Sequence, residues 1–178
     1  MVGLTAWDGN GVDSVLEKHY AETRRKLKEK LLKLSPGDFE ELVSRLLFSL
    51  GFTDVIRTRL SGDGGVDVLG KISSAGGTLQ VNLAVQAKRW KNNVQAPTVQ
   101  QIRGSLGAHD QGCIVTTSDF SKGAREEAQR SDSIPITLIN GDDLVNLLLE
   151  KQIGVRRESV PVYTIRENIL SVPEEDEE

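Results

Sequence analysis

The chain has 178 residues, of which 38% are hydrophobic and 27% are charged. This length accommodates one ordinary domain, with residues left over for an arm or a tail. No apolar run approaches the length of a membrane span, and Met1 is not followed by a secretory signal pattern. We therefore expect a cytoplasmic protein without membrane contact. The single cysteine, Cys113, excludes an internal disulfide, and two histidines leave little room for a histidine-rich metal site.

The net charge of −4 hides an uneven distribution of charge along the chain. The last five residues, 174–178, are all acidic, and the rest of the chain carries a net charge of +1. A run of like charges at a terminus is usually solvated. The acidic average therefore argues only weakly against binding to a nucleic acid.

A first helix is predicted over residues 13–34, which have a helical composition. The stretch is rich in basic residues, namely Arg24, Arg25, Lys26, Lys28, Lys30 and Lys33. It is interpreted either as a solvated helix with glutamate partners, or as a basic arm on a phosphate backbone or a linker from another domain.

The remaining elements follow in a regular order. Ser35 is the predicted N-cap of a second helix, with Pro36 at its first position, and Gly51 ends that helix. Strands are predicted over 54–60, 66–72, 79–89, 113–117 and 134–139, and further helices over 98–109, 122–130 and 141–151. The alternation of strands and helices in the second half predicts an α/β fold with parallel or mixed strand pairing.

Polar residues gather at the end of the strand that contains residues 81–88. Because side chains alternate along a strand, Gln86 and Lys88 share one face. Asp67 lies on the preceding predicted strand, which can be the antiparallel neighbour, so that Asp67 faces Gln86 and Lys88. A carboxylate and an amide oxygen suit Mg²⁺ or Mn²⁺, and a lysine beside the metal can orient water or offset phosphate charge. This set fits phosphodiester hydrolysis, and the alternative from spacing alone is a structural ion pair between Asp67 and Lys88.

Six short motifs occur in one order along residues 35–151. They are Phe39-Glu40-Glu41-Leu42-Val43, Gly51-Phe52, Gly62-Asp63-Gly64-Gly65-Val66-Asp67-Val68, Val85-Gln86-Ala87-Lys88-Arg89-Trp90, Val99-Gln100-Gln101-Ile102-Arg103-Gly104, and Thr116-Thr117-Ser118-Asp119-Phe120-Ser121 with Ala124. Together they resemble the catalytic domain of the Mrr family of restriction endonucleases, within the PD-(D/E)xK nuclease superfamily. The resemblance implies a restriction-endonuclease-like αβββαβ core, with a mixed central sheet flanked by helices. It also implies a nuclease domain over 35–153, preceded by the arm or linker (1–34) and followed by an extension with the acidic tail (154–178).

The resemblance implies a role for each residue of the site. Asp67 matches the metal-binding aspartate, and Lys88 matches the catalytic lysine. Gln86 stands where most of the superfamily has Glu or Asp, and Glu40 matches a helix glutamate that approaches the metal. Ala87 would contribute its backbone carbonyl as a metal ligand.

Gln86 leaves the site with one certain negative charge, that of Asp67. Glu40 would supply a second if it reaches inward; otherwise it is a surface carboxylate favoured by the helix dipole. Asp63 is interpreted either as a turn residue or as a second contact to metal or water.

Predicted DNA contacts cluster in sequence around this site. They are Arg57, Arg59, Arg89, Lys91, Gln101 and Arg103. Trp90 would either stack on a base or sugar or pack against the protein. Thr117 and Ser118 would either contact phosphate or cap the following helix. No element that reads a DNA sequence is recognisable.

The resulting hypothesis is an endonuclease that uses Mg²⁺, with Mn²⁺ as a substitute, to cut double-stranded DNA. The resemblance implies restriction of foreign or methylated DNA, with a separate recognition domain or partner. Cutting both strands favours a homodimer or a higher homo-oligomer. The alternatives are a structure-selective resolvase or repair nuclease, and a non-catalytic DNA-binding or assembly module on the same fold.

Overall fold

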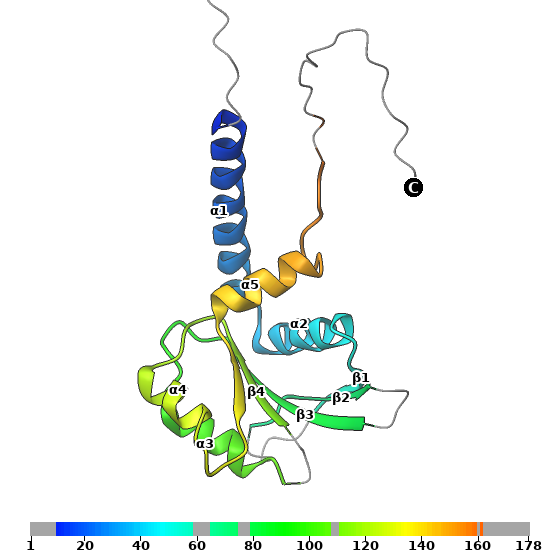
Figure 1. Ribbon diagram of the computed structural model, residues 1–178, viewed down its shortest axis with the longest axis vertical. Coiled ribbons are helices and arrows are strands. Elements are labelled where there is room, and N and C mark those ends of the chain that lie inside the picture. Colours follow the sequence, from blue (N-terminus) through cyan, green and yellow to red (C-terminus); the bar gives the residue numbers. More distant parts are fainter. Residues whose placement is uncertain (1–9, 59–64, 75–78, 108–110, 160, 162–178) are drawn as a thin grey trace, which may run out of the picture.

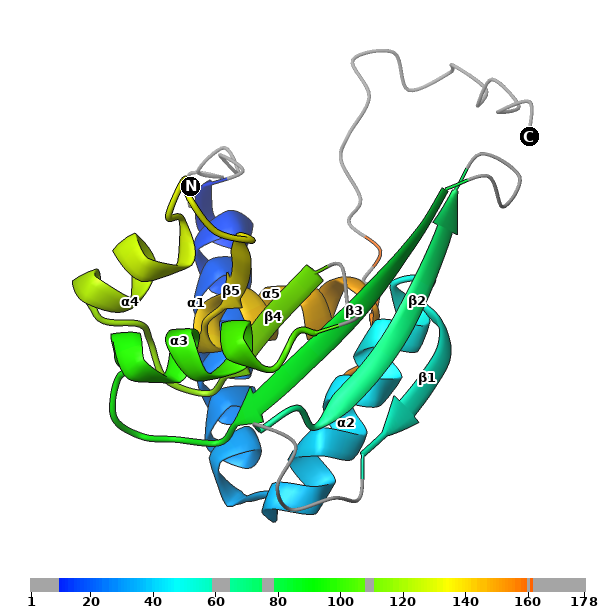
Figure 2. The same cartoon turned by 90° about the horizontal axis from the view of Figure 1, so that it is seen from below.

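A single mixed sheet organises the chain. The computed structural model describes residues 10–58, 65–74, 79–107, 111–159 and 161. The strands stand in the order β1-β2-β3-β4-β5, with β1 at one edge and β5 at the other (Figure 2). The first three pair antiparallel, and β3, β4 and β5 pair parallel. Their bounds are β1 Thr53–Arg57, β2 Val68–Ser74, β3 Leu79–Lys88, β4 Gln111–Thr116 and β5 Ile136–Ile139.

Helices cover both faces of this sheet. The helices α2 and α5 lie on one side, and α3 and α4 lie on the other (Figure 1). Their bounds are α1 Asn10–Lys33, α2 Pro36–Ser49, α3 Ala96–Gly104, α4 Lys122–Ala128 and α5 Gly141–Glu150. From α2 to α5 the order of elements is the predicted one, and the predicted α/β class with a mixed, helix-flanked sheet is confirmed.

The two apolar layers of the core fix the orientation of β3. Val85 is buried with Phe39 of α2 in one layer, and Ala84 is buried with Ile102 of α3 in the other. Because side chains alternate along a strand, Gln86 points to the same side as Ala84. Because β3 is packed on both faces, the core fixes the face of the sheet toward which the Gln86 side chain points.

Near the site, two predicted boundaries of secondary-structure elements differ from those in the structure. The predicted strand over 66–72 begins only at Val68, so Asp67 precedes β2. The predicted helix over 98–109 is α3, which begins at Ala96 because Pro97 suits a first helical turn, and it ends at Gly104. The helix α2 begins as predicted, since the Ser35 hydroxyl accepts a hydrogen bond from the Asp38 backbone at 3.1 Å.

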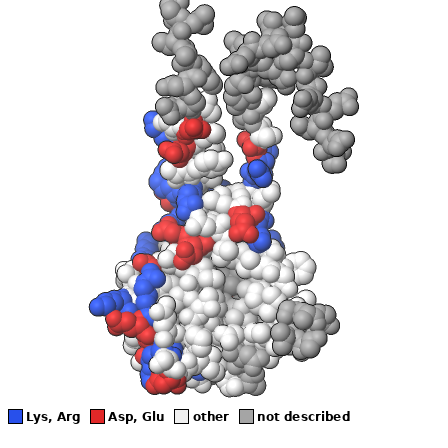
Figure 3. Space-filling view, in the orientation of Figure 1, with Lys and Arg blue, Asp and Glu red and all other residues white. Residues whose placement is uncertain are grey.

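The helix α1 has two distinct parts. Leu27 and Leu31, near its end, are buried in the same core layer as α2 and α5. Leu16 and Tyr20, nearer its start, remain exposed. Basic and acidic side chains are interspersed along it (Figure 3), and Arg25 pairs with both Glu22 and Glu29. These pairs favour the interpretation of a solvated helix. Among the described residues, none of the helices is long and apolar enough to cross a membrane.

Candidate active site

The carboxylate of Asp67 is pinned to the backbone of β3. The Asp67 backbone N–H donates to the carbonyl of Val85 at 2.8 Å, and its side-chain Oδ2 accepts from the Ala87 N–H at 2.7 Å. The Asp67 side chain thus accepts the hydrogen bond from the Ala87 N–H that a backbone carbonyl would accept if β2 began earlier in the chain. This contact holds the half-buried carboxylate against the segment that carries Gln86 and Lys88.

The side chain of Gln86 is completely buried, and its amide has no hydrogen-bond partner among the residues that the structure describes. Its relative exposure is 0%, and neither Oε1 nor Nε2 has a hydrogen-bond partner within the described part of the chain. An unsatisfied buried amide costs about 1–3 kcal/mol. Such a group in a native fold points to a bound water or ion.

Gly65 covers this amide. A Cβ atom added at Gly65 would lie 2.1 Å from Gln86 Nε2 and 3.5 Å from Gln101 Nε2. Gly65 also has a φ of +88°, in the left-handed region that favours glycine. Gly65 therefore has a steric role that its sequence context did not reveal, and Gln101 lies beside Gln86.

Glu40 of α2 approaches Asp67 from the other core layer. Its side chain is 26% exposed. Burial raises the pKa of Glu40, the nearby charge of Asp67 raises it further, and Arg57, 3.8 Å away, opposes the rise. The two carboxylates are close enough to repel each other. This placement favours the inward interpretation of Glu40 over that of an isolated surface carboxylate.

Lys88 ends β3 and lies over Trp90. The Lys88 Nζ is 5.4 Å from the centre of the Trp90 indole ring. Trp90 remains 42% exposed.

Several of the predicted DNA contacts are engaged with the protein. Arg57 pairs with Glu41 at 3.1 Å, and Arg89 donates to the Leu32 carbonyl of α1 at 2.9 Å. Arg103 donates to the carbonyls of Ile134 and Glu127 and to the Glu127 carboxylate. Each of the three guanidinium groups thus has at least one partner in the protein.

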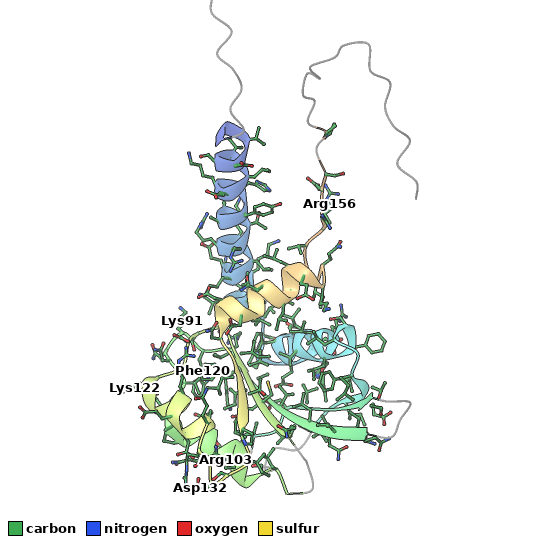
Figure 4. All side chains as sticks on the ribbon, viewed as in Figure 1. Lys91, Arg103, Phe120, Lys122, Asp132 and Arg156 are labelled. Atoms are coloured by element: carbon green, nitrogen blue, oxygen red, sulfur yellow. The ribbon has the colours of Figure 1, made fainter. Side chains whose placement is uncertain are left out.

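Lys91 is exposed and lies beside a hollow at the ends of the parallel strands. The hollow has a volume of about 260 Å³, and its walls include Lys28, Trp90 and Ser118. Lys91 and Arg103 lie at opposite ends of the domain (Figure 4). Arg59 and Asp63 lie outside the described residues.

The threonines at the end of β4 support the end of β3. Thr116 Oγ1 donates to the Lys88 carbonyl at 2.7 Å, and Thr117 Oγ1 donates to the Trp90 carbonyl at 2.8 Å. The cap of α4 is instead Ser121, whose hydroxyl accepts from the Ala124 N–H. The structure thus gives Thr117 a contact that differs from both interpretations of the sequence, and only the pairing of β3 with β4 reveals it.

We expect acid to weaken the contact between α3 and α4 that Glu127 makes. Hydrogen bonds from Gln100 and Arg103 lower the pKa of Glu127. A lowered folded-state pKa contributes stability above the unfolded pKa, near 4.5, and that stability is lost as the pH falls through the folded value. Glu127→Gln should therefore reduce the free energy of unfolding at pH 7, and the deficit should shrink below about pH 4.

Urea unfolding at pH 7 and at a pH below about 4 measures the difference in the free energy of unfolding between Glu127→Gln and the parent. The matched control is Glu126→Gln, on the same helix, whose side chain is 65% exposed. A deficit for Glu127→Gln that is independent of pH would contradict the assigned ionisation.

Comparisons with known proteins agree with this geometry. Residues 31–148 match the model of a family described as "Restriction endonuclease" (Mrr_cat). The type IV methyl-directed restriction enzyme EcoKMrr of Escherichia coli (strain K12) is 36% identical over 133 residues, which are 71% of this chain and 42% of that enzyme.

Two solved structures share the fold. The DNA modification-dependent restriction endonuclease AspBHI matches with a TM-score of 0.61 and 28% identity, over 74% of this chain and 36% of its own. The MspJI restriction endonuclease in complex with a 27-mer oligonucleotide matches with a TM-score of 0.54 and 26% identity, over 72% of this chain and 30% of its own. The chain thus spans less than half the length of each of these three proteins. Because the family model matches more than half of its residues, the chain belongs to the Mrr family of restriction endonuclease catalytic domains.

Proposed function

We propose that this chain is a metal-dependent DNA endonuclease that hydrolyses phosphodiester bonds in foreign or methylated duplex DNA. One observation carries the proposal: in a chain of the Mrr family, Asp67 is held against β3, the strand that carries Gln86 and Lys88. Glu40 lies near Asp67, and the buried amide of Gln86 has no hydrogen-bond partner among the described residues. The names of EcoKMrr and AspBHI, which are methyl-directed and modification-dependent, support a modified substrate.

The residues present fit a hard divalent cation. Mg²⁺ prefers oxygen ligands and commonly uses one or two carboxylates. Asp67 and Glu40 supply two, and the Gln86 Oε1 and the Ala87 carbonyl would complete the protein's share. Within the described chain, no group of three or more His, Cys, Asp or Glu side chains is placed to hold a metal ion, and Mg²⁺ usually keeps several waters among its ligands. When bound, Mg²⁺ or Mn²⁺ would supply a water of lowered pKa and would neutralise phosphate charge.

The chain's own residues have distinct tasks in this proposal. The Ala87 N–H fixes the orientation of Asp67. The Lys88 ammonium donates hydrogen bonds to the attacking water or to a phosphate oxygen and offsets the charge that develops there. Lys91, exposed beside the end of β3, contacts a neighbouring phosphate without reading a base.

A second copy of the chain and a recognition partner belong to the proposal as well. One site per chain cuts one strand, so a duplex break needs a homodimer or a higher homo-oligomer. The greater length of the three relatives leaves room in them for parts that select the DNA.

Removal of divalent cations tests the proposal. We expect supercoiled plasmid to be nicked and linearised with Mg²⁺ or Mn²⁺, and to stay intact in excess chelator. Methylated and unmethylated plasmid, compared with a branched duplex, separate restriction from resolution. Undiminished cleavage in chelator would contradict metal dependence. Binding of every DNA without cleavage of any would identify a non-catalytic module.

A further inference from the structure

We infer that Thr116, Thr117 and Trp90 are positioning residues that hold the ammonium group of Lys88 at the end of β3. The inference rests on the proposed function for the role of Lys88, and on the geometry of β3 and β4 for everything else. None of the three residues needs to touch DNA or a metal for this role.

The end of β3 is held by a local set of hydrogen bonds. The Lys88 carbonyl accepts from Thr116 Oγ1 at 2.7 Å, from the Trp90 N–H at 2.9 Å and from the Thr117 N–H at 3.3 Å. The Trp90 carbonyl accepts from Thr117 Oγ1 at 2.8 Å. The backbone on both sides of Arg89 is therefore tied to the end of β4.

The two threonines are buried, at 0% and 2% relative exposure. A buried hydroxyl needs a partner, and here both partners are carbonyls of the segment that carries Lys88. Valine has nearly the same shape as threonine and lacks the hydroxyl donor. The contribution of each hydroxyl can therefore be separated from that of the side-chain volume.

The indole ring completes the support. The backbone turn after β3 places the Trp90 ring 5.4 Å from Lys88 Nζ, within the range of a cation–π interaction. A lysine side chain has a flexible four-carbon stem, and it loses much rotamer freedom when it is held in one place. Thr117 holds the backbone carbonyl of Trp90, and a ring on a fixed backbone reduces that loss before the substrate arrives, which favours a reactive geometry.

Two kinds of variant test the inference in the full chain. Thr117→Val removes the hydroxyl, and Thr117→Ser restores it. Trp90→Leu removes the π face at a partly exposed site, where folding is least at risk, and Trp90→Phe retains a weaker one. Thr137→Val, at an exposed threonine of β5, is the matched control.

The first readout does not need activity. In spectra of lysine labelled with ¹³C, the side-chain CH₂ signals of Lys88, identified by their loss in Lys88→Ala, should be shifted upfield by the indole ring. The shift should vanish in Trp90→Leu, decrease in Thr117→Val, and return in Thr117→Ser.

The second readout is plasmid cleavage. We expect kcat to fall about tenfold in Thr117→Val and in Trp90→Leu, and about threefold in Trp90→Phe, with KM for DNA nearly unchanged. Thr117→Ser and Thr137→Val should cleave like the parent. A purely structural role would lower the active fraction without moving the Lys88 signals, and Thr117→Ser would not restore them.

The outcomes separate this inference from the proposed function. Parent-like Lys88 signals in Trp90→Leu would overturn the inference, and so would an unchanged kcat in an enzyme that cuts DNA. If the parent does not cut DNA but the Lys88 signals respond as expected, the proposed function fails and the positioning stands. If Thr117→Val does not fold, the two Trp90 variants decide the question by the same criteria.

Discussion

Replacement of Asp67 by asparagine is expected to lower the rate of DNA cleavage by about 10²–10³-fold while the fold is retained. The amide oxygen of asparagine can accept the same hydrogen bond from the Ala87 N–H, so the end of β2 stays in place. The substitution removes the charge, and a neutral amide binds a hard cation less well than a carboxylate does. With Gln86 already neutral, Glu40 would be the one carboxylate left among the described residues of the site.

The same variant has a second expected effect, on Glu40. The nearby charge of Asp67 helps to raise the pKa of Glu40, so its removal should lower that pKa. A carboxyl titration by ¹³C NMR measures this change, and calorimetry with Mn²⁺ measures the loss of cation affinity. Both measurements use the intact chain without DNA.

Asp54→Asn is the matched control for this experiment. Asp54 lies on β1 with a side chain that is 62% exposed and paired to Lys71, and asparagine tolerates its φ of +49°. Cleavage by this variant should equal that of the parent. Equal cleavage by Asp67→Asn and the parent would remove Asp67 from the mechanism.

Gly65→Ala is expected to cost about 2–4 kcal/mol of folding stability and to impair cleavage. The left-handed backbone accounts for about 1–2 kcal/mol of this loss. The rest comes from the new methyl group, which would lie 2.1 Å from Gln86 Nε2. The amide is fully buried, so it can yield only by displacing its neighbours or by leaving the place where it would bind a cation.

Gly51→Ala separates the two contributions. Gly51 has a φ of +93°, and a Cβ there meets nothing within 4 Å. Urea unfolding should give this control only the backbone cost, about 1–2 kcal/mol, and its cleavage rate should match the parent. In the double variant Gly65→Ala/Gln86→Ala the steric part of the loss should disappear. Equal losses at Gly65 and Gly51 would show that the methyl group is accommodated without displacing Gln86.

Local patterns were sufficient to predict the order of the elements and the ends of the strand that carries Lys88. The cap at Ser35 and the apolar spacing after it define α2 without any distant partner. Alternation along β3 determines that Gln86 and Lys88 share a face. These features depend only on residues that lie close together in the sequence, so one sequence is enough to predict them.

Boundaries that depend on a distant partner were predicted less well. Asp67 was placed inside a strand, yet the strand begins after it, because its side chain takes the hydrogen bond from Ala87. Arg89 and Arg103, for which phosphate contacts are predicted, donate hydrogen bonds to carbonyls on other elements, and the sequence did not indicate these bonds. A long cationic side chain binds whichever acceptor packing brings within reach, and its own sequence neighbourhood does not specify that acceptor.

The amino-acid sequence by itself determined the α/β class and the family, and it predicted which residues form the site. Only the tertiary structure decided that Glu40 approaches Asp67, that Gly65 covers Gln86, and that Thr116 and Thr117 hold the end of β3. Residue type and spacing set the direction of a side chain relative to its own helix or strand. What that side chain meets depends on how the sheet and its helices pack, and this packing is a property of the whole chain.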